Sequence, residues 1–83
     1  MEKAKMLYQE KFPVGSNVRI KDRPLLEEFH RTWKYHHPLS TEQIGYGGHS
    51  DFIVRVSFYH GGDVLYNLKI APGIWHEALL EAV

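Results

Sequence analysis

Histidine is the residue type that first suggests chemistry, because six imidazoles occur in 83 residues. A zinc site needs neutral imidazoles that converge on the ion at about 2.0–2.1 Å, with a further ligand to complete the shell. The chain has no HxH, HExxH or i, i+4 histidine pair, and the adjacent His36 and His37 point in different directions in any regular structure. We therefore predict scattered surface imidazoles, with no metal and no other cofactor. Two alternative pairings at one rim stay open: His60 with Asp63, and His76 with Glu77.

Nucleophilic catalysis has little support among the residues present. The chain has no cysteine, and its serines lack the GxSxG context of a nucleophile elbow. His49, Ser50 and Asp51 are the residue types of a catalytic triad, but three consecutive side chains cannot meet as a triad requires. We therefore predict a chain that is not itself an enzyme, or that serves an enzyme only as an accessory subunit.

Aromatic side chains are more numerous than a core of this size easily hides. Tyr66 and Trp75 are predicted in the core, whereas Tyr35, Tyr46 and Tyr59 are predicted to stay partly exposed. Exposed aromatics beside histidines and an arginine are typical of protein interfaces, and ordinary surface tyrosines are the alternative. The predicted partner-binding residues are Tyr35, His36, His37, Tyr46, His49, Arg55, Tyr59, His60 and Asp63.

Charge and composition limit the classes of partner. Ten basic and ten acidic residues cancel, which weakens an interpretation based on attraction to nucleic acid. No apolar run is long enough to span a bilayer, and the first residues lack the apolar segment of a signal peptide. We therefore expect a cytoplasmic protein with a protein partner, and the absence of cysteine suits a reducing compartment. The composition predicts no oligomeric state.

A long hairpin must position the residues around Tyr59 and Asp63. Hydrophobic and polar residues alternate on both sides of the glycine pair, and a loop of residues 60–62 gives one face only apolar pairs. Those pairs are Phe52 with Ile70, Val54 with Leu68, Val56 with Tyr66, and Phe58 with Val64. The other face then pairs Tyr59 with Asp63, Arg55 with Asn67, and Ile53 with Lys69. A three-residue loop needs a residue in the left-handed region, which Gly62 supplies, so the glycines predict a bend rather than a ligand cradle.

One helix is predicted, at about residues 23–35. Asp22 is placed to cap it, and Pro24 lies in its first turn, where a missing N–H costs nothing. Glu27 and Arg31 are expected to pair at i, i+4 on its outer side. Its apolar stripe is Leu25, Leu26, Phe29 and Trp33.

Shorter elements surround this helix and the hairpin. They are a strand at 18–20, a turn that starts at 40–43, a brief strand at 44–46, a strand that starts at 74–77, a 3₁₀ turn at 78–80 and a last strand at 81–83. A single C-terminal helix from residue 75 is the alternative. Together the elements predict a mainly β fold, a small SH3-like, partly open barrel over residues 12–83 with one helical insertion. Residues 1–11 form an N-terminal segment that is expected either to fray or to dock as a short turn.

A set of short motifs resembles the SH3-like C-terminal domain of the nitrile hydratase β-subunit. The motifs are Phe12, Gly15, Val18, Arg19, His37-Pro38, Gly45, Gly48, Leu65-Tyr66, Trp75-His76-Glu77 and Leu79-Leu80-Glu81. The resemblance covers residues 12–83 and implies an SH3-like fold and a chain that works beside a partner, since in that family the partner subunit holds the metal through cysteines. The long helical N-terminal part of that subunit is absent here. Its basic residues after the His motif have no clear match, and residues 43–46 stand in their place.

The leading interpretation is a non-catalytic SH3-like interaction module, a small subunit or accessory protein of a larger complex. Its binding face would be a rim formed by the segment around residues 35–37, the loop at 46–49 and the hairpin tip. Two alternatives stay open. One is a nitrile-hydratase-β-like subunit that supports a metalloenzyme site on another chain, and the other is an RNA- or ribosome-associated barrel.

Overall fold

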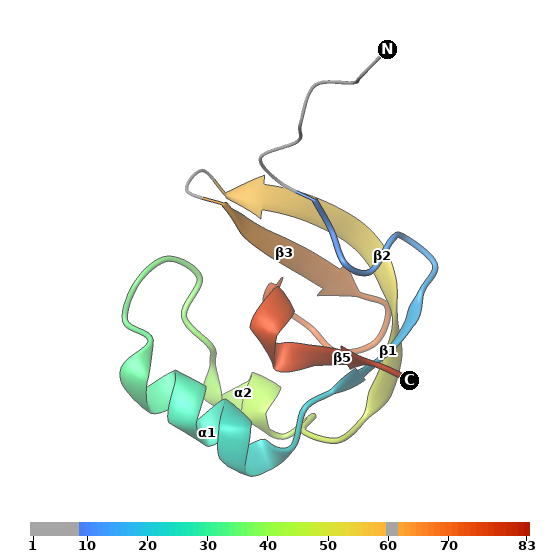
Figure 1. Cartoon of the computed structure of the whole chain (residues 1–83). Coiled ribbons are helices and arrows are strands. Elements are labelled where there is room, and N and C mark those ends of the chain that lie inside the picture. Colours follow the sequence, from blue (N-terminus) through green and yellow to red (C-terminus); the bar gives the residue numbers. More distant parts are fainter. Residues whose placement is uncertain (1–8, 60–61) are drawn as a thin grey trace.

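A five-stranded antiparallel sheet carries the fold in the computed structural model, which describes residues 9–59 and 62–83 (Figure 1). The strands are β1 (Asn17–Ile20), β2 (Ser50–Tyr59), β3 (Asp63–Leu68), β4 (Trp75–His76) and β5 (Leu80–Ala82). Their order is β4-β3-β2-β1-β5; within the described ranges the edge strands β4 and β5 do not pair with each other, so the sheet is not closed. Helices α1 (Arg23–Thr32) and α2 (Thr41–Ile44) lie between β1 and β2, and a 3₁₀ turn, η1 (Glu77–Leu79), precedes β5. The predicted mainly β class is confirmed.

The long strand β2 joins the two halves of the sheet and sets the hairpin register. Its first residues pair with β1, and the rest of the strand pairs with β3. The predicted pairs nearest the tip are confirmed: Phe58 with Val64, Val56 with Tyr66, Tyr59 with Asp63, and Arg55 with Asn67. The loop has the predicted three residues, and Gly62 has a φ of +103°, a conformation that favours glycine. His60 and Gly61 lie outside the described residues.

The predicted register is wrong in the half of the hairpin that lies farther from the tip. A β-bulge between Ile53 and Arg55 shifts the pairing, so that Ile53 rather than Val54 lies opposite Leu68, and Lys69 N donates to Phe52 O at 3.0 Å. An extra residue in one strand reverses which side chains face inward. Ile53 is therefore buried while Val54 is exposed. Two further predicted pairs do not form for the same reason, Phe52 with Ile70 and Ile53 with Lys69. The side chains of Phe52 and Ile70 are exposed.

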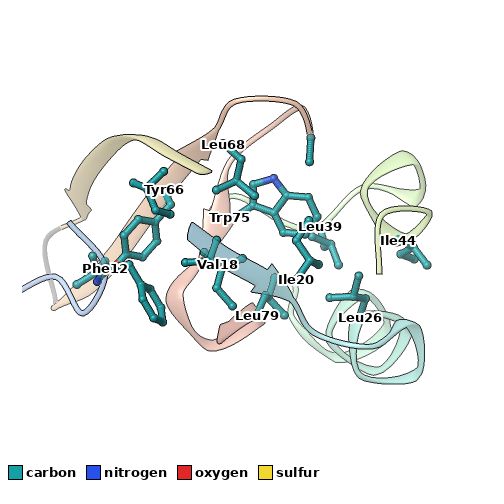
Figure 2. Close-up of a cluster of buried hydrophobic side chains, with 14 residues drawn as sticks. Phe12, Val18, Ile20, Leu26, Leu39, Ile44, Tyr66, Leu68, Trp75 and Leu79 are labelled. Carbon is teal, nitrogen blue, oxygen red and sulfur yellow. Dashed lines mark hydrogen bonds between the residues drawn. The ribbon is translucent and has the colours of Figure 1, made fainter. Parts of the chain in front are cut away.

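The hydrophobic core lies on the inner face of the bent sheet and extends to the helices (Figure 2). Trp75 and Tyr66 are fully buried, as predicted, and the Trp75 indole N–H donates to the Pro72 carbonyl at 3.1 Å. Leu26 from α1 and Ile44 from α2 belong to the same cluster, so the helices pack on the sheet. The other largest fully buried side chains are Val18, Ile20, Ile53 and Leu79. Full burial of one such side chain contributes about 1.5–3 kcal/mol.

Helix α1 begins where it was predicted and ends earlier. Its last helical residue is Thr32, not residue 35, and Trp33 follows with extended backbone at the C-cap. Asp22 occupies the N-cap position, but its carboxylate bonds Arg19 at 2.6 Å instead of capping the helix. The predicted Glu27–Arg31 pair is wrong: Glu27 pairs with Arg23, and Arg31 pairs with Glu28. In the predicted stripe, Leu26 is buried and Phe29 is half-buried, whereas Leu25 is exposed.

The shorter elements mostly follow the prediction. The turn at 40–43 becomes α2, which Ser40 and Gln43 open with a reciprocal capping box. The prediction of a brief strand at 44–46 is wrong, because Ile44 ends α2 and residues 45–48 form a turn. At the C-terminal end, β4, η1 and β5 replace the alternative of a single helix.

The N-terminal segment is described only from residue 9. Residues 1–8 lie outside the described residues, and with them most of the predicted segment 1–11. The Lys11 amide is fixed, since it donates to the Tyr66 hydroxyl at 3.1 Å and to Glu77 Oε2 at 2.9 Å. In residues 9–59 and 62–83, neither helix has the length and apolar character needed to cross a membrane.

Candidate functional site

Six rings from three separate parts of the chain pack together beside the hairpin tip. The rings of Phe29 and Trp33 stack at 5.4 Å, and the His36 ring stacks on Tyr59 at 3.8 Å with an interplanar angle of 12°. His76 from β4 joins the two stacks, at 5.2 Å from Trp33 and 5.5 Å from His36. Figure 1 shows the loop after α1 extending toward the β2–β3 tip. We call this set the ring cluster: Phe29, Trp33, His36, His37, Tyr59 and His76.

The loop after α1 is held in place by hydrogen bonds from ring nitrogens to its main-chain carbonyls. The three pairs are Trp33 Nε1 to His36 O at 2.8 Å, His76 Nε2 to His37 O at 2.9 Å, and His30 Nδ1 to Leu39 O at 2.7 Å. Because a carbonyl oxygen can only accept, the bonded nitrogen of each imidazole must carry the proton. The contacts therefore assign the tautomers, with the proton on Nε2 in neutral His76 and on Nδ1 in neutral His30.

His37 has an unusual backbone at the point where the loop meets β4. Its φ is +49°, and among the described residues it is the sole non-glycine with a positive φ. This left-handed conformation costs most residues about 1–2 kcal/mol, although histidine adopts it more readily than bulkier types. The His76 imidazole bonds the carbonyl of this residue. The surrounding contacts thus stabilise a backbone that is locally unfavourable.

The hairpin tip contacts His36 through two facing residues. Tyr59 and Asp63 are the pair that closes the hairpin, and Tyr59 supplies the ring on which His36 stacks. Asp63 Oδ2 lies 2.7 Å from His36 Nε2, but the N–H bond is not aligned with that oxygen. The contact is therefore electrostatic rather than a directed hydrogen bond, and it becomes an ion pair when the imidazole is protonated. The tip and the loop are thus joined by both a stack and a charge contact.

His76 is the buried titratable ring of the cluster. Burial lowers its pKa from the usual value of 6.5, and the hydrogen bond to the His37 carbonyl opposes that shift in part. Burial penalises the charged imidazolium because it removes the solvating water. At pH 7 the ring is therefore neutral, consistent with its role as a single Nε2–H donor to the loop.

A cleft of about 250 Å³ adjoins the ring cluster. Phe29, Trp33 and His76 supply its aromatic wall, while Asp63 and Glu77 supply carboxylates; Gly62, Val64 and Ala78 complete the lining. Glu77 Oε2 accepts hydrogen bonds from the Tyr66 hydroxyl at 2.6 Å and from the Lys11 amide. Burial, together with this bond to Glu77, raises the pKa of Tyr66 to about 12. The cleft therefore joins apolar rings to fixed negative charge.

The structure brings together part of the predicted binding rim. Tyr35, whose ring meets Trp33 edge-on at 4.9 Å, lies beside the ring cluster. Four other residues of the predicted rim lie at the same end of the molecule: His36, His37, Tyr59 and Asp63. Tyr59 is half-buried under His36, so it is less free than a solvent-facing anchor.

Three other predicted rim residues are described and are not members of the ring cluster: Tyr46, His49 and Arg55. Tyr46 packs against the core and contacts His49 at 5.6 Å, in the turn that leads into β2. Arg55 is exposed on β2 opposite Asn67. His60 lies outside the described residues. The ring cluster and its cleft therefore form one candidate site, and the Tyr46–His49 contact is a separate feature.

Sequence reasoning missed several residues of the cleft. The apolar stripe predicts Trp33 within the helix, but the residue follows the last helical residue and its indole N–H donates to the His36 carbonyl of the loop. The prediction of scattered surface imidazoles is wrong for His76, which is buried and bonds the His37 carbonyl, while Glu77 bonds Tyr66 rather than His76. No sequence pattern places residue 76 beside residue 37. Among the residues described, no group of three or more His, Asp or Glu side chains could hold a metal ion.

Comparison with known proteins gives no relative: no family model, no curated protein and no solved structure matches the chain.

Proposed function

We propose that the chain is a non-catalytic protein-interaction module with an SH3-like, partly open barrel fold, and that the ring cluster and its cleft form the binding face. The fold part of this proposal is supported by the strand order β4-β3-β2-β1-β5 and by the 3₁₀ turn just before the last strand. In this arrangement the final strand returns to pair with β1, as it does in SH3-like barrels. The edge strands β4 and β5 of the described residues do not pair with each other, which fits a barrel that is only partly closed.

The observation that carries the functional part is the size and lining of the cleft. Pockets for cofactors and small molecules usually measure about 300–1,000 Å³, whereas this cleft measures about 250 Å³. A space of that size suits one side chain of a protein partner better than a metabolite. Trp33 lines the cleft, and the ring of the exposed Tyr35 lies against the ring of Trp33. Tryptophan and tyrosine are the residue types that most often dominate binding energy at protein interfaces.

Capture from an extract of the source cells tests the proposal. The immobilised chain is compared with Tyr35→Ala and with Ile70→Ala, because Tyr35 and Ile70 are similarly exposed, at 69% and 68%. We expect wild type and Ile70→Ala to retain the same protein, and Tyr35→Ala to bind it about tenfold more weakly, a loss of about 1.4 kcal/mol. Recovery that nuclease abolishes, or equal capture by all three chains, would contradict the proposal. A captured metalloprotein with cysteine ligands would specify the accessory-subunit role.

A further inference from the structure

We propose that the cleft binds the cationic side chain of a lysine or arginine from the protein partner, with the rings along its stem and the carboxylates at its charged head. This inference rests on the proposed function, because it names the part of the partner that enters the binding face. The negative charge of the cleft lining favours a cationic occupant.

The charge of the lining is the first argument. Among the described residues that line the cleft are two carboxylates, Asp63 and Glu77, and no lysine or arginine. The contacts that the described residues make to these groups engage Oδ2 of Asp63, with His36, and Oε2 of Glu77. One oxygen of each carboxylate is therefore left for a ligand. His76 is neutral at pH 7, so it does not cancel this negative charge.

The rings are the second argument. Phe29 and Trp33 stack with an interplanar angle of only 16°, and both residues of this stacked pair line one wall of the cleft. The His76 ring is tilted by 50° to Phe29 and by 65° to Trp33, so it forms a second wall at an angle to the first. An apolar stem packs well against such walls, and a cation is attracted to the face of an indole. A neutral aliphatic side chain would satisfy the walls but not the two carboxylates.

The test is an NMR titration of the full chain with small side-chain probes. The probes are Nα-acetyl-lysine methylamide, Nα-acetyl-arginine methylamide and the norleucine counterpart, which has a similar apolar stem without the charge. We expect saturable shifts of the Trp33 indole N–H and of the Asp63, Val64 and Ala78 amides. At least one cationic probe should bind about tenfold or more tightly than the norleucine probe. The two cationic arms show whether an ammonium or a guanidinium fits better.

Charge-removing variants complete the test. Asp63→Asn keeps the shape of the side chain and should weaken the cationic probe about fivefold or more, without weakening the norleucine probe. Glu77→Gln should do the same, and a urea transition shows whether it remains folded, since Glu77 also bonds Tyr66. Glu42→Gln is the matched control, because Glu42 lies on α2 and does not line the cleft. Equal binding of all probes, shifts confined to other residues, or unchanged affinity in Asp63→Asn would overturn the proposal.

The two proposals fail in different ways. If a protein partner is captured through Tyr35 but its binding is unaffected by Asp63→Asn, the interaction function stands and the cationic occupant is wrong. If the cationic probes bind in the cleft while capture is equal for wild type and Tyr35→Ala, the cation site stands and the assignment of the partner face is wrong.

Discussion

The imidazole of His36 lies face to face on the phenol ring of Tyr59, with ring centroids 3.8 Å apart and planes 12° apart. His36 belongs to the loop after α1, and Tyr59 is the last residue of β2. The contact therefore joins the helical insertion to the hairpin tip, on the same side as the cleft. The shape of the proposed binding face depends on this contact between the two rings.

A double-mutant cycle on His36→Ala and Tyr59→Ala measures the stack. Aromatic pairs contribute about 0.5–1.5 kcal/mol beyond the area that they bury, so we expect a coupling free energy of that size. Urea unfolding of wild type, the two single variants and the double variant gives the value. Ile70→Ala is the control, with an expected change within about 0.5 kcal/mol because the side chain is exposed. A coupling near zero would mean that the two rings do not stabilise each other.

The His76 imidazole should make stability depend on pH. Its folded-state pKa is lowered by burial, so the folded protein binds this proton less readily than the unfolded chain does. The associated stability is fully present above the unfolded value of about 6.5 and is lost as the pH falls below it. Between about pH 6.5 and pH 5, the free energy of unfolding should therefore fall more steeply in wild type than in His76→Gln. Glutamine can still donate to the His37 carbonyl but does not titrate. Equal slopes would contradict the assignment, as would a His76 ring resonance that titrates above pH 6.5.

The left-handed backbone of His37 reverses the usual ranking of alanine and glycine. Both His37→Ala and His37→Gly remove the imidazole, so the comparison isolates the backbone. At a φ of +49° glycine is unstrained, and we expect His37→Gly to be more stable than His37→Ala by about 1 kcal/mol. Thermal or urea unfolding of the two variants decides the matter. The opposite order would mean that the loop does not need this conformation.

Neighbouring leucines on α1 should differ sharply in their contribution to stability. Leu26 is fully buried among core residues, and Leu25 is exposed. Leu26→Ala leaves a cavity and should cost about 2–5 kcal/mol, whereas Leu25→Ala should stay within about 0.5 kcal/mol. Denaturant unfolding of the pair is a matched comparison, because chemistry and helix position are nearly the same. A similar loss in the free energy of unfolding for both variants would contradict the assignment of Leu26, and not Leu25, to the buried face of α1.

Strand pairing was predictable only where a short-range signal fixed it. The loop length and the glycines determine the register near the tip, so the pairs of Tyr59 with Asp63 and Val56 with Tyr66 could be read from alternation. The bulge beside Ile53 left no such signal, because both Ile53 and Val54 are apolar and either can occupy the inner face. Alternation of period two cannot show an inserted residue when its neighbours are alike.

The candidate site was predictable in its residue types more than in its geometry. An exposed tyrosine next to two histidines points to the loop after α1, and the structure places these three rings at the ring cluster. The end of the helix could not be located, since Trp33 continues the apolar stripe although the chain has already left the helix. The hydrogen bond from His76 to the His37 carbonyl spans 39 positions, and it depends on how β4 and the loop pack. Local patterns carry no information on a contact of that separation.

The central claim is that the chain binds a protein through the ring cluster and its cleft, and site-specific photo-crosslinking tests it most directly. A benzophenone amino acid is placed at Tyr35, beside Trp33, or at Phe52, an exposed aromatic on β2 near the bulge. Each chain is then irradiated in the source cells. We predict one crosslinked protein from position 35, little or none from position 52, and a strong reduction when position 35 is combined with Asp63→Asn. Equal crosslinking from both positions, or crosslinking from position 52 alone, would contradict the claim.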